Sequence, residues 1–88
     1  MRARELIGER VVALDGTSIG EIIDLEIDDQ WKVSGLIISL EKDIAKRLGF
    51  RITFRAKGKV PIDIVKGAKR FITLDVEGED LLEKIEKL

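Results

Sequence analysis

Apolar and polar residues alternate along much of this chain with the period of two that a half-buried strand requires. Segment 10–28 is the clearest case, because an Asp15-Gly16 pair separates a run over 10–14 from a longer run that ends at Asp28. An Asp-Gly pair between β-branched runs supplies the positive φ angles of a tight hairpin. The alternation predicts two faces for the longer run: an inner face of Ile23, Leu25 and Ile27, and an outer face of Asp24, Glu26 and Asp28.

Two glycines coincide with a change in the phase of this alternation. Next to Gly20, the order of apolar and polar residues is inverted, which predicts a bulge or strong bend over 20–22. After a reversal at 29–30, the run 31–40 changes its apolar parity at Gly35, which predicts a second bend. Repeated bends are how a small sheet curls toward closure.

The middle of the chain predicts a short helix over 41–49, since Ile44 and Leu48 are four residues apart and Gly49 is suited to end a helix. A strand over 51–57 follows, with a basic outer face, and then a turn at 57–59. Pro61 indicates a strand end that leads into a short turn of helix. A loop is expected at 66–69.

The last third of the chain predicts one more strand, over 70–76, with Ile72, Leu74 and Val76 on one face. A helix over 78–88 follows, with acidic residues in its first turn. Its apolar face is expected to consist of Leu81, Leu82, Ile85 and Leu88. Such a short helix needs a surface to pack on, either its own barrel or a second molecule.

Composition excludes several classes of chemistry. The 88 residues suit one small domain over 1–88, and they include no Cys, no His and no Tyr. We therefore expect no zinc site, no disulfide, no imidazole-dependent catalysis and no cofactor. The carboxylates of Asp24, Glu26, Asp28 and Asp29 are spaced too widely along a strand to hold one metal ion together. The sequence predicts a protein that is not an enzyme.

Location and habitat follow from the same composition. No run of 18 or more apolar residues is present, so we expect a cytoplasmic protein with no direct membrane insertion. The chain has no Asn, one Gln and one Met, beside abundant Ile, Glu and Lys. Depletion of thermolabile residues is typical of proteins from hot environments, which predicts a thermophile.

Charge is strongly segregated along the chain. Residues 1–40 carry a net charge of −4, residues 41–70 carry +7, and residues 71–88 carry −4. The basic middle segment is suited to attract an acidic protein, a nucleic acid or a second copy of the chain, or simply to solvate one end of the fold. For nucleic acid, the phosphate contacts would come from Arg51, Arg55, Lys57, Lys59, Lys66, Lys69 and Arg70. Of the four aromatic residues, only Phe50 is expected to be free to stack on a base.

The order of these motifs resembles the PRC-barrel domain family. The resemblance rests on residues 7–12, on the Asp15-Gly16 turn, on residues 19–24 and on residues 60–65. It implies an all-β fold with minor α content: a small, partly open meander barrel of five or six strands, with a short helix after the third strand and a C-terminal helix. Stand-alone archaeal members of the family, some implicated as adaptors in division by the tubulin-like ring, are the most similar type.

Charge layout, the apolar helix and the resemblance together predict a non-enzymatic interaction module. We expect it to form homodimers or larger assemblies and to bind another protein, with archaeal cell division as the implied setting. The expected partner-binding residues are Arg51, Arg55, Lys57, Asp24, Glu26, Asp28, Leu81, Leu82, Ile85 and Leu88. The alternative is an RNA- or ribosome-associated maturation factor that uses the basic middle segment.

Overall fold

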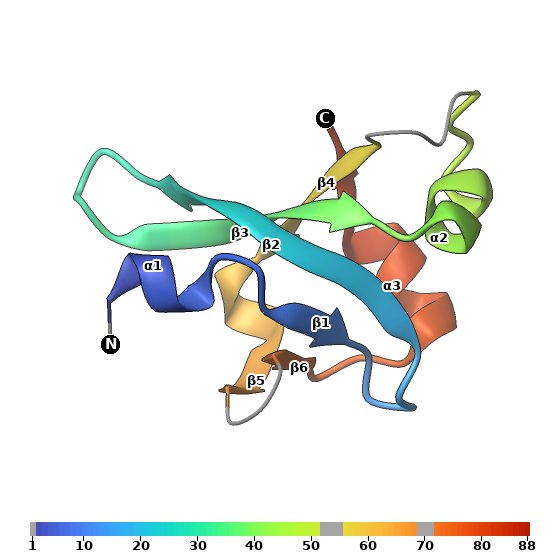
Figure 1. Cartoon of the computed structure of the whole chain (residues 1–88), viewed down its shortest axis with the longest axis horizontal. Coiled ribbons are helices and arrows are strands. Elements are labelled where there is room, and N and C mark those ends of the chain that lie inside the picture. The colour runs from blue at the N-terminus through green and yellow to red at the C-terminus, as the bar shows by residue number, and fades with distance from the viewer. Residues whose placement is uncertain (1, 52–55, 69–71) are drawn as a thin grey trace.

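The strands of the computed structural model belong to one curled sheet, which wraps around the core as a half-barrel (Figure 1). The structure describes residues 2–51, 56–68 and 72–88. Within these ranges the strand order is β5-β6-β1-β2-β3-β4-β7. The elements are α1 (Ala3–Leu6), β1 (Arg10–Val12), β2 (Ser18–Ile27), β3 (Val33–Leu40), α2 (Lys42–Arg47), β4 (Lys57–Pro61), the 3₁₀ turn η1 (Ile62–Ile64), β5 (Val65–Ala68), β6 (Ile72–Leu74), α3 (Gly78–Lys84) and β7 (Glu86–Lys87).

Four consecutive antiparallel strands, β1 to β4, form the meander at the centre of the sheet. The predicted Asp-Gly hairpin joins the first two: Gly16 has φ +88°, and the Ala13 N–H donates to the Thr17 carbonyl at 2.9 Å. On its other edge β1 pairs in parallel with β6. The mostly-β, partly open barrel is confirmed, with seven described strands instead of five or six because β5 and the two-residue β7 extend the edges.

Both predicted bends are present as breaks in strand register. Between β1 and β2 the pairing passes from Val11 with Gly20 to Val12 with Ser18, which leaves Ile19 as an extra residue beside Gly20. Between β2 and β3 the pairing skips Ser34, the neighbour of Gly35. Gly20 must be a glycine, because a Cβ there would lie 2.0 Å from the Ser39 carbonyl oxygen. The bulges curl the long strands around the core.

A third break removes residues from the inner face that we expected for β2. The register skips Ile23, so that Ile22 lies opposite Ile38 and Asp24 lies opposite Ile37. Ile22 is fully buried, whereas Ile23 is 39% exposed. The prediction that Ile23, Leu25 and Ile27 face the core is therefore wrong for Ile23 and Ile27, and Leu25 is only half-buried.

The helix after β3 confirms its prediction, although it is shorter than expected. Ile44 and Ala45 of α2 are buried in the core. The helix ends in a Schellman motif: the Phe50 N–H donates to the Ala45 carbonyl at 3.1 Å and the Gly49 N–H to the Lys46 carbonyl at 3.0 Å. Gly49 has φ +88°, which is why a glycine is suited to this position.

The segment between α2 and β6 departs most from expectation. The predicted turn at 57–59 is wrong, because Gly58 lies inside β4 and packs close to Ile85. The predicted loop at 66–69 is wrong over 66–68, which belong to β5. Pro61 does end its strand and lead into η1, as predicted. Most of the predicted strand 51–57 falls on residues 52–55, which lie outside the described residues. Residues 70–71 of the predicted strand 70–76 also lie outside them.

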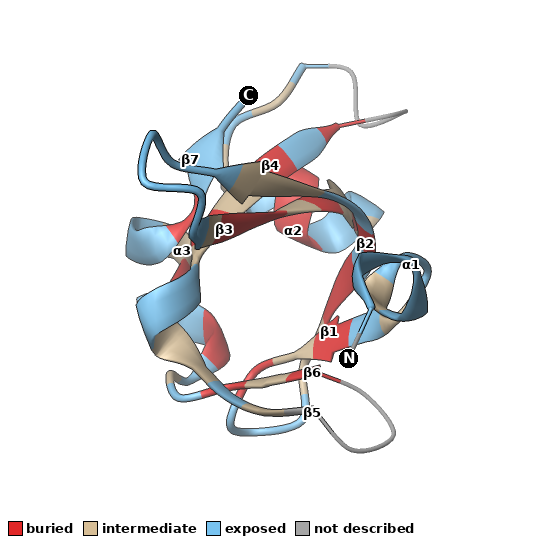
Figure 2. Cartoon of the chain, turned by 90° about the vertical axis from the view of Figure 1, so that its left-hand side faces the viewer, coloured by how far each residue is buried: buried red, intermediate tan, exposed pale blue. Residues whose placement is uncertain are grey.

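The C-terminal helix α3 closes one side of the core, with Leu81 fully buried and Ile85 7% exposed (Figure 2). It is shorter than predicted, since the chain leaves the helix at Ile85 and pairs as β7 with β4. Buried apolar side chains from the strands and from α2 and α3 form one cluster inside the curl. The core thus leaves two ends of the molecule free for contacts: the β2–β3 turn and α2 (Figure 1).

Candidate interaction surfaces

The turn between β2 and β3 is held by Asp28. One oxygen of its carboxylate accepts the N–H of Gln30 at 2.9 Å and the N–H of Lys32 at 3.0 Å. Its backbone closes the turn as well, since the Trp31 N–H donates to the Asp28 carbonyl at 3.0 Å. Aspartate forms such turns because its short side chain reaches backbone N–H groups two residues on. The turn is therefore a fixed feature that presents its outer residues to solvent.

Trp31 lies at the outer end of this turn with an unusual backbone. Its φ is +63°, and it is the one non-glycine residue of the described chain with a positive φ. Its side chain is 86% exposed. A bulky residue in this region of conformational space is rare, because its Cβ crowds the backbone. The fold gains no core packing from this tryptophan.

Two further exposed apolar residues lie at the base of the turn. Ile27 and Val33 are directly paired across β2 and β3, and they are 53% and 38% exposed. Together with Trp31 they form what we name the hairpin tip. Clustered exposed apolar side chains are typical of interaction sites. Acidic residues Asp24, Asp28 and Asp29 lie along the same arm and are exposed.

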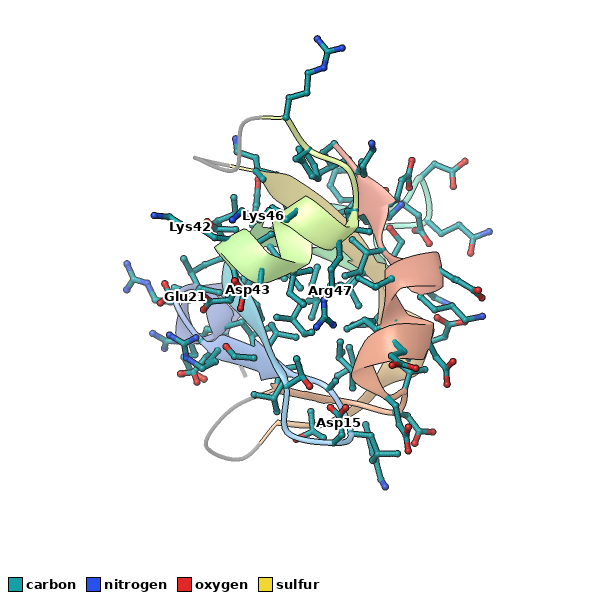
Figure 3. The ribbon with its side chains drawn as sticks, turned by 90° about the vertical axis from the view of Figure 1, so that its right-hand side faces the viewer. Asp15, Glu21, Lys42, Asp43, Lys46 and Arg47 are labelled. Atoms are coloured by element: carbon teal, nitrogen blue, oxygen red, sulfur yellow. The ribbon has the colours of Figure 1, made fainter. Side chains whose placement is uncertain are left out.

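The opposite end of the molecule carries the exposed cations of α2 (Figure 3). Lys46 and Arg47 lie in the last turn of the helix, where the helix dipole favours positive charge. Lys42 lies in the first turn beside Asp43. The Arg47 side chain points away from the helix across the open end of the barrel (Figure 3). The helix α2 therefore carries three cations and one acid, and the acids Glu21 and Glu41 lie beside it, both paired with Arg10.

A hollow of about 350 Å³ lies beside the helix, and we name it the α2 hollow; its lining is Arg10, Thr17, Ser18, Glu41, Asp43, Ile44 and Arg47. Arg10 is held on one side, since it donates to Ser18 Oγ at 2.7 Å and to Glu41 Oε1 at 2.8 Å. Glu21 contacts the same guanidinium at 3.4 Å. Within the described part of the chain, Arg47 forms no ion pair.

The basic residues predicted as one strand face do not share a strand in the described chain. Arg51 is exposed just beyond the end of α2, and Lys57 is exposed at the start of β4. Arg55 lies outside the described residues. Lys59 forms an ion pair with Glu26. Phe50, expected to be free for stacking, is half-buried against the core, with the Lys87 ammonium 5.4 Å from its ring centre.

Of the acidic and apolar residues predicted to bind a partner, some are exposed to solvent and others are buried in their own chain. Asp24 and Asp28 are exposed, as expected of an outer face, and Glu26 is half-buried in its ion pair. Leu81 and Ile85 are occupied by the core of their own chain, and Leu82 is half-buried against it. Leu88 is 56% exposed, beyond β7.

Sequence reasoning missed Trp31, because it placed this residue in the strand that begins there. The signal was present in Asp28-Asp29-Gln30, a run of turn-forming and polar residues directly before the tryptophan. Asp28 and Lys32 are joined by a backbone hydrogen bond, which leaves a loop of three residues, and such a loop ends in a left-handed residue that here is Trp31 and not a glycine.

Comparison with known families agrees with this geometry. The sequence model of the PRC-barrel domain matches residues 1–81. The chain belongs to the PRC-barrel family. This family is a small β-barrel module that is generally not catalytic. The search of curated proteins gives no match.

The described part of this PRC-barrel has no cluster of acidic side chains and no long apolar helix. Over residues 2–51, 56–68 and 72–88, no three acidic side chains gather closely enough to hold a metal ion. Over the same ranges, no helix has the length and apolar character needed to span a membrane. Among the exposed large apolar residues of the described chain, Trp31 has the highest exposed fraction.

Proposed function

We propose that this PRC-barrel is a non-enzymatic interaction module that associates with itself and acts as an adaptor for another protein. The observation that carries the proposal is Trp31, which is 86% exposed on a turn fixed by Asp28. Aromatic residues on rigid elements are the residues that most often supply binding energy at protein interfaces. The paired Ile27 and Val33 extend this apolar surface.

Charge supports the proposal. The arm of the hairpin tip carries Asp24, Asp28 and Asp29 against Lys32, whereas the cations Lys42, Lys46 and Arg47 are exposed at α2. Complementary charge steers encounters and suppresses wrong partners. Two surfaces of opposite sign on one chain favour contacts between copies. The lack of His and Cys in the sequence supports a role that does not involve catalysis.

The first test is the molar mass of the purified chain over a wide range of concentration, measured by light scattering after gel filtration and by sedimentation equilibrium. We expect a mass that rises with concentration. A monomer at every concentration and at low salt would overturn self-association.

The cellular setting that we propose is division in an archaeon, where the module would link proteins of the division ring. Affinity purification from the native cell followed by mass spectrometry tests this setting. Enrichment of the tubulin-like ring protein over ribosomal proteins supports it. Enrichment of ribosomal proteins alone points to the second candidate.

The second candidate function is binding of RNA, and the exposed cations of α2 favour it. The covered position of Phe50 counts against it, because single-stranded RNA is usually held by stacking on free aromatic rings. A mobility shift with single-stranded RNA at low salt tests the candidate. If Lys57→Glu together with Arg55→Glu abolishes the shift without unfolding the chain, the candidate stands.

A further inference from the structure

We propose that copies of this chain associate head to tail, with Trp31 of one copy seated in the α2 hollow of the next. This inference rests on the proposed self-association and specifies its geometry. It joins two features that the fold of a single copy leaves unexplained: an exposed tryptophan on a strained turn, and a hollow whose Arg47 has no ion-pair partner in the described chain.

The tip has the properties of an inserted anchor. The position of Trp31 favours glycine, because φ is +63°. An outlier of this kind persists where a functional contact requires it. The turn is already fixed by the Asp28 carboxylate, so little conformational freedom is lost when the indole is immobilised.

The α2 hollow has the properties of a receptor for one aromatic ring. Its volume of about 350 Å³ lies at the small end of the roughly 300–1,000 Å³ range of protein binding pockets, which suits a single side chain better than a chain segment. Ile44 gives it an apolar contact at the edge of the core. The Arg47 guanidinium is able to stack on an indole face, an arrangement that arginine and tryptophan favour.

Charge determines which surface meets which. The anchor carries Asp28 and Asp29 before Trp31 and Lys32 directly after it, and Asp24 lies farther along the same arm. The lining of the hollow is balanced, with Arg10 and Arg47 against Glu41 and Asp43. The helix α2 beside it adds the exposed Lys42 and Lys46. An arm with a net negative charge therefore meets a helix that carries three cations and one acid. Two tips brought together would instead oppose acidic residues, which is unfavourable.

The two surfaces lie at opposite ends of the longest axis of the molecule, which measures 33 Å (Figure 1). A copy is therefore unable to fill its own hollow. A contact between two different surfaces of the same chain leaves a free tip and a free hollow at the ends of each assembly. Such assemblies grow into open chains or close into rings.

The experiment uses the single tryptophan as its probe. Trp31→Gly keeps the hollow and removes the anchor, and glycine suits the backbone at this position. Arg47→Glu keeps the anchor and reverses the charge of the receptor. We expect Trp31→Gly to weaken self-association by roughly 30-fold or more and Arg47→Glu by roughly 10-fold or more, measured by sedimentation.

The two variants are then mixed. The Trp31→Gly protein has no tryptophan, so all emission comes from the Arg47→Glu protein. We expect the emission to shift to shorter wavelength as the Trp31→Gly protein is added, with saturation at one to one. We expect the mass to stop at two subunits, because the mixed complex has neither a working tip nor a working hollow left.

Controls of matched charge and position complete the design. Lys66→Glu makes the same type of charge reversal on β5, and Gln30→Ala changes the neighbour of Trp31 in the same turn. Both variants are expected to assemble like the original chain. Circular dichroism checks that all four variants are folded.

The outcomes separate this inference from the proposed function. Assembly that survives Trp31→Gly, or a mixture of the two variants that gives no shift and no complex, overturns the head-to-tail contact while self-association stands. A monomeric original chain overturns both.

Discussion

Lys59 reaches Glu26 by passing over Gly35. The ion pair joins β4 to β2 across the intervening strand β3. A Cβ at Gly35 would lie 2.9 Å from Lys59 Cε and 3.2 Å from Lys59 Cγ. The glycine thus leaves room for the lysine stem on the outer face of the sheet. The glycine at the predicted bend has this second role, which the alternation of residues did not indicate.

Gly35→Ala is expected to destabilise the fold by about 1–3 kcal/mol, because the added methyl group forces the lysine stem and the Val60 carbonyl to move. Urea unfolding measures the change. Gly67→Ala is the matched control, since a Cβ at Gly67 meets nothing within 4 Å. The explanation fails if Lys59→Ala, which removes the stem, does not reduce the cost of Gly35→Ala.

The ion pair predicts a dependence of stability on alkaline pH. The hydrogen bond with Glu26 raises the pKa of Lys59 above its ordinary value of 10.5, despite the opposing effect of desolvation. When the pKa of Lys59 is higher in the folded chain than in the unfolded chain, the charged lysine stabilises the fold at any pH below the pKa of the unfolded chain. This stabilisation is lost as the pH rises through the pKa of the folded chain. Between the two pKa values, the melting temperature of the original chain is expected to fall more steeply with rising pH than the melting temperature of Lys59→Met. Equal slopes would contradict the role of the pair.

Asp15 predicts a dependence of stability on acidic pH. Its carboxylate accepts hydrogen bonds from Thr17, which lower its pKa from the ordinary value of 3.8, and from the Gly78 N–H at the start of α3. When the pKa of Asp15 is lower in the folded chain than in the unfolded chain, the ionised carboxylate stabilises the fold at any pH above the pKa of the unfolded chain. This stabilisation is lost as the pH falls through the pKa of the folded chain. Thr17→Val is expected to move the pKa of Asp15 back toward 3.8, as measured by NMR titration of the carboxyl carbon. An unchanged titration would exclude the Thr17 hydroxyl as the cause.

Leu81→Ala is expected to cost about 2–5 kcal/mol, because the side chain is fully buried and its removal leaves a cavity. Leu88→Ala, at a position 56% exposed, is expected to change stability by less than about 0.5 kcal/mol. Both values come from urea unfolding at a concentration where the chain is monomeric. A small effect of Leu81→Ala would mean that α3 does not close the core in solution.

Trp31→Gly is expected to stabilise the monomer by about 1 kcal/mol, because glycine has no Cβ to crowd the backbone at φ +63°. Gln30→Gly, one position earlier, is expected to destabilise by about 0.5–1 kcal/mol through the entropy of the unfolded chain. Thermal unfolding of the dilute proteins measures both. A loss of stability in Trp31→Gly would show that the indole supports its own fold.

The turns and bends of the barrel could be predicted from the sequence more accurately than the inward-facing residues of its strands. The Asp15-Gly16 hairpin and the bends beside Gly20 and Gly35 follow from local backbone preferences, which a sequence states directly. The face of β2 did not follow, because the extra residue proved to be Ile23. Leu25 keeps its inner position opposite Leu36, whereas the register breaks at Ile23 and before Ile27 leave these two residues exposed.

The candidate surfaces were only partly accessible from sequence. The acidic outer residues Asp24 and Asp28 were recognised, because charges on alternate positions indicate solvent. The role of Lys59 was not recognised, since its partner Glu26 lies two strands away. The α2 hollow combines residues from three separate segments, and only the fold brings them together.

The parallel pairing of β1 with β6 also sets an order for folding during synthesis. The strands β1 to β4 pair with neighbours in sequence. The second edge of β1 is paired only when β6 is present, because Val11 pairs with Ile72, about 60 residues later. A nascent chain therefore exposes one unprotected strand edge until the last quarter has left the ribosome. Truncation before β6 would leave this edge of β1 unpaired, and unpaired strand edges favour aggregation.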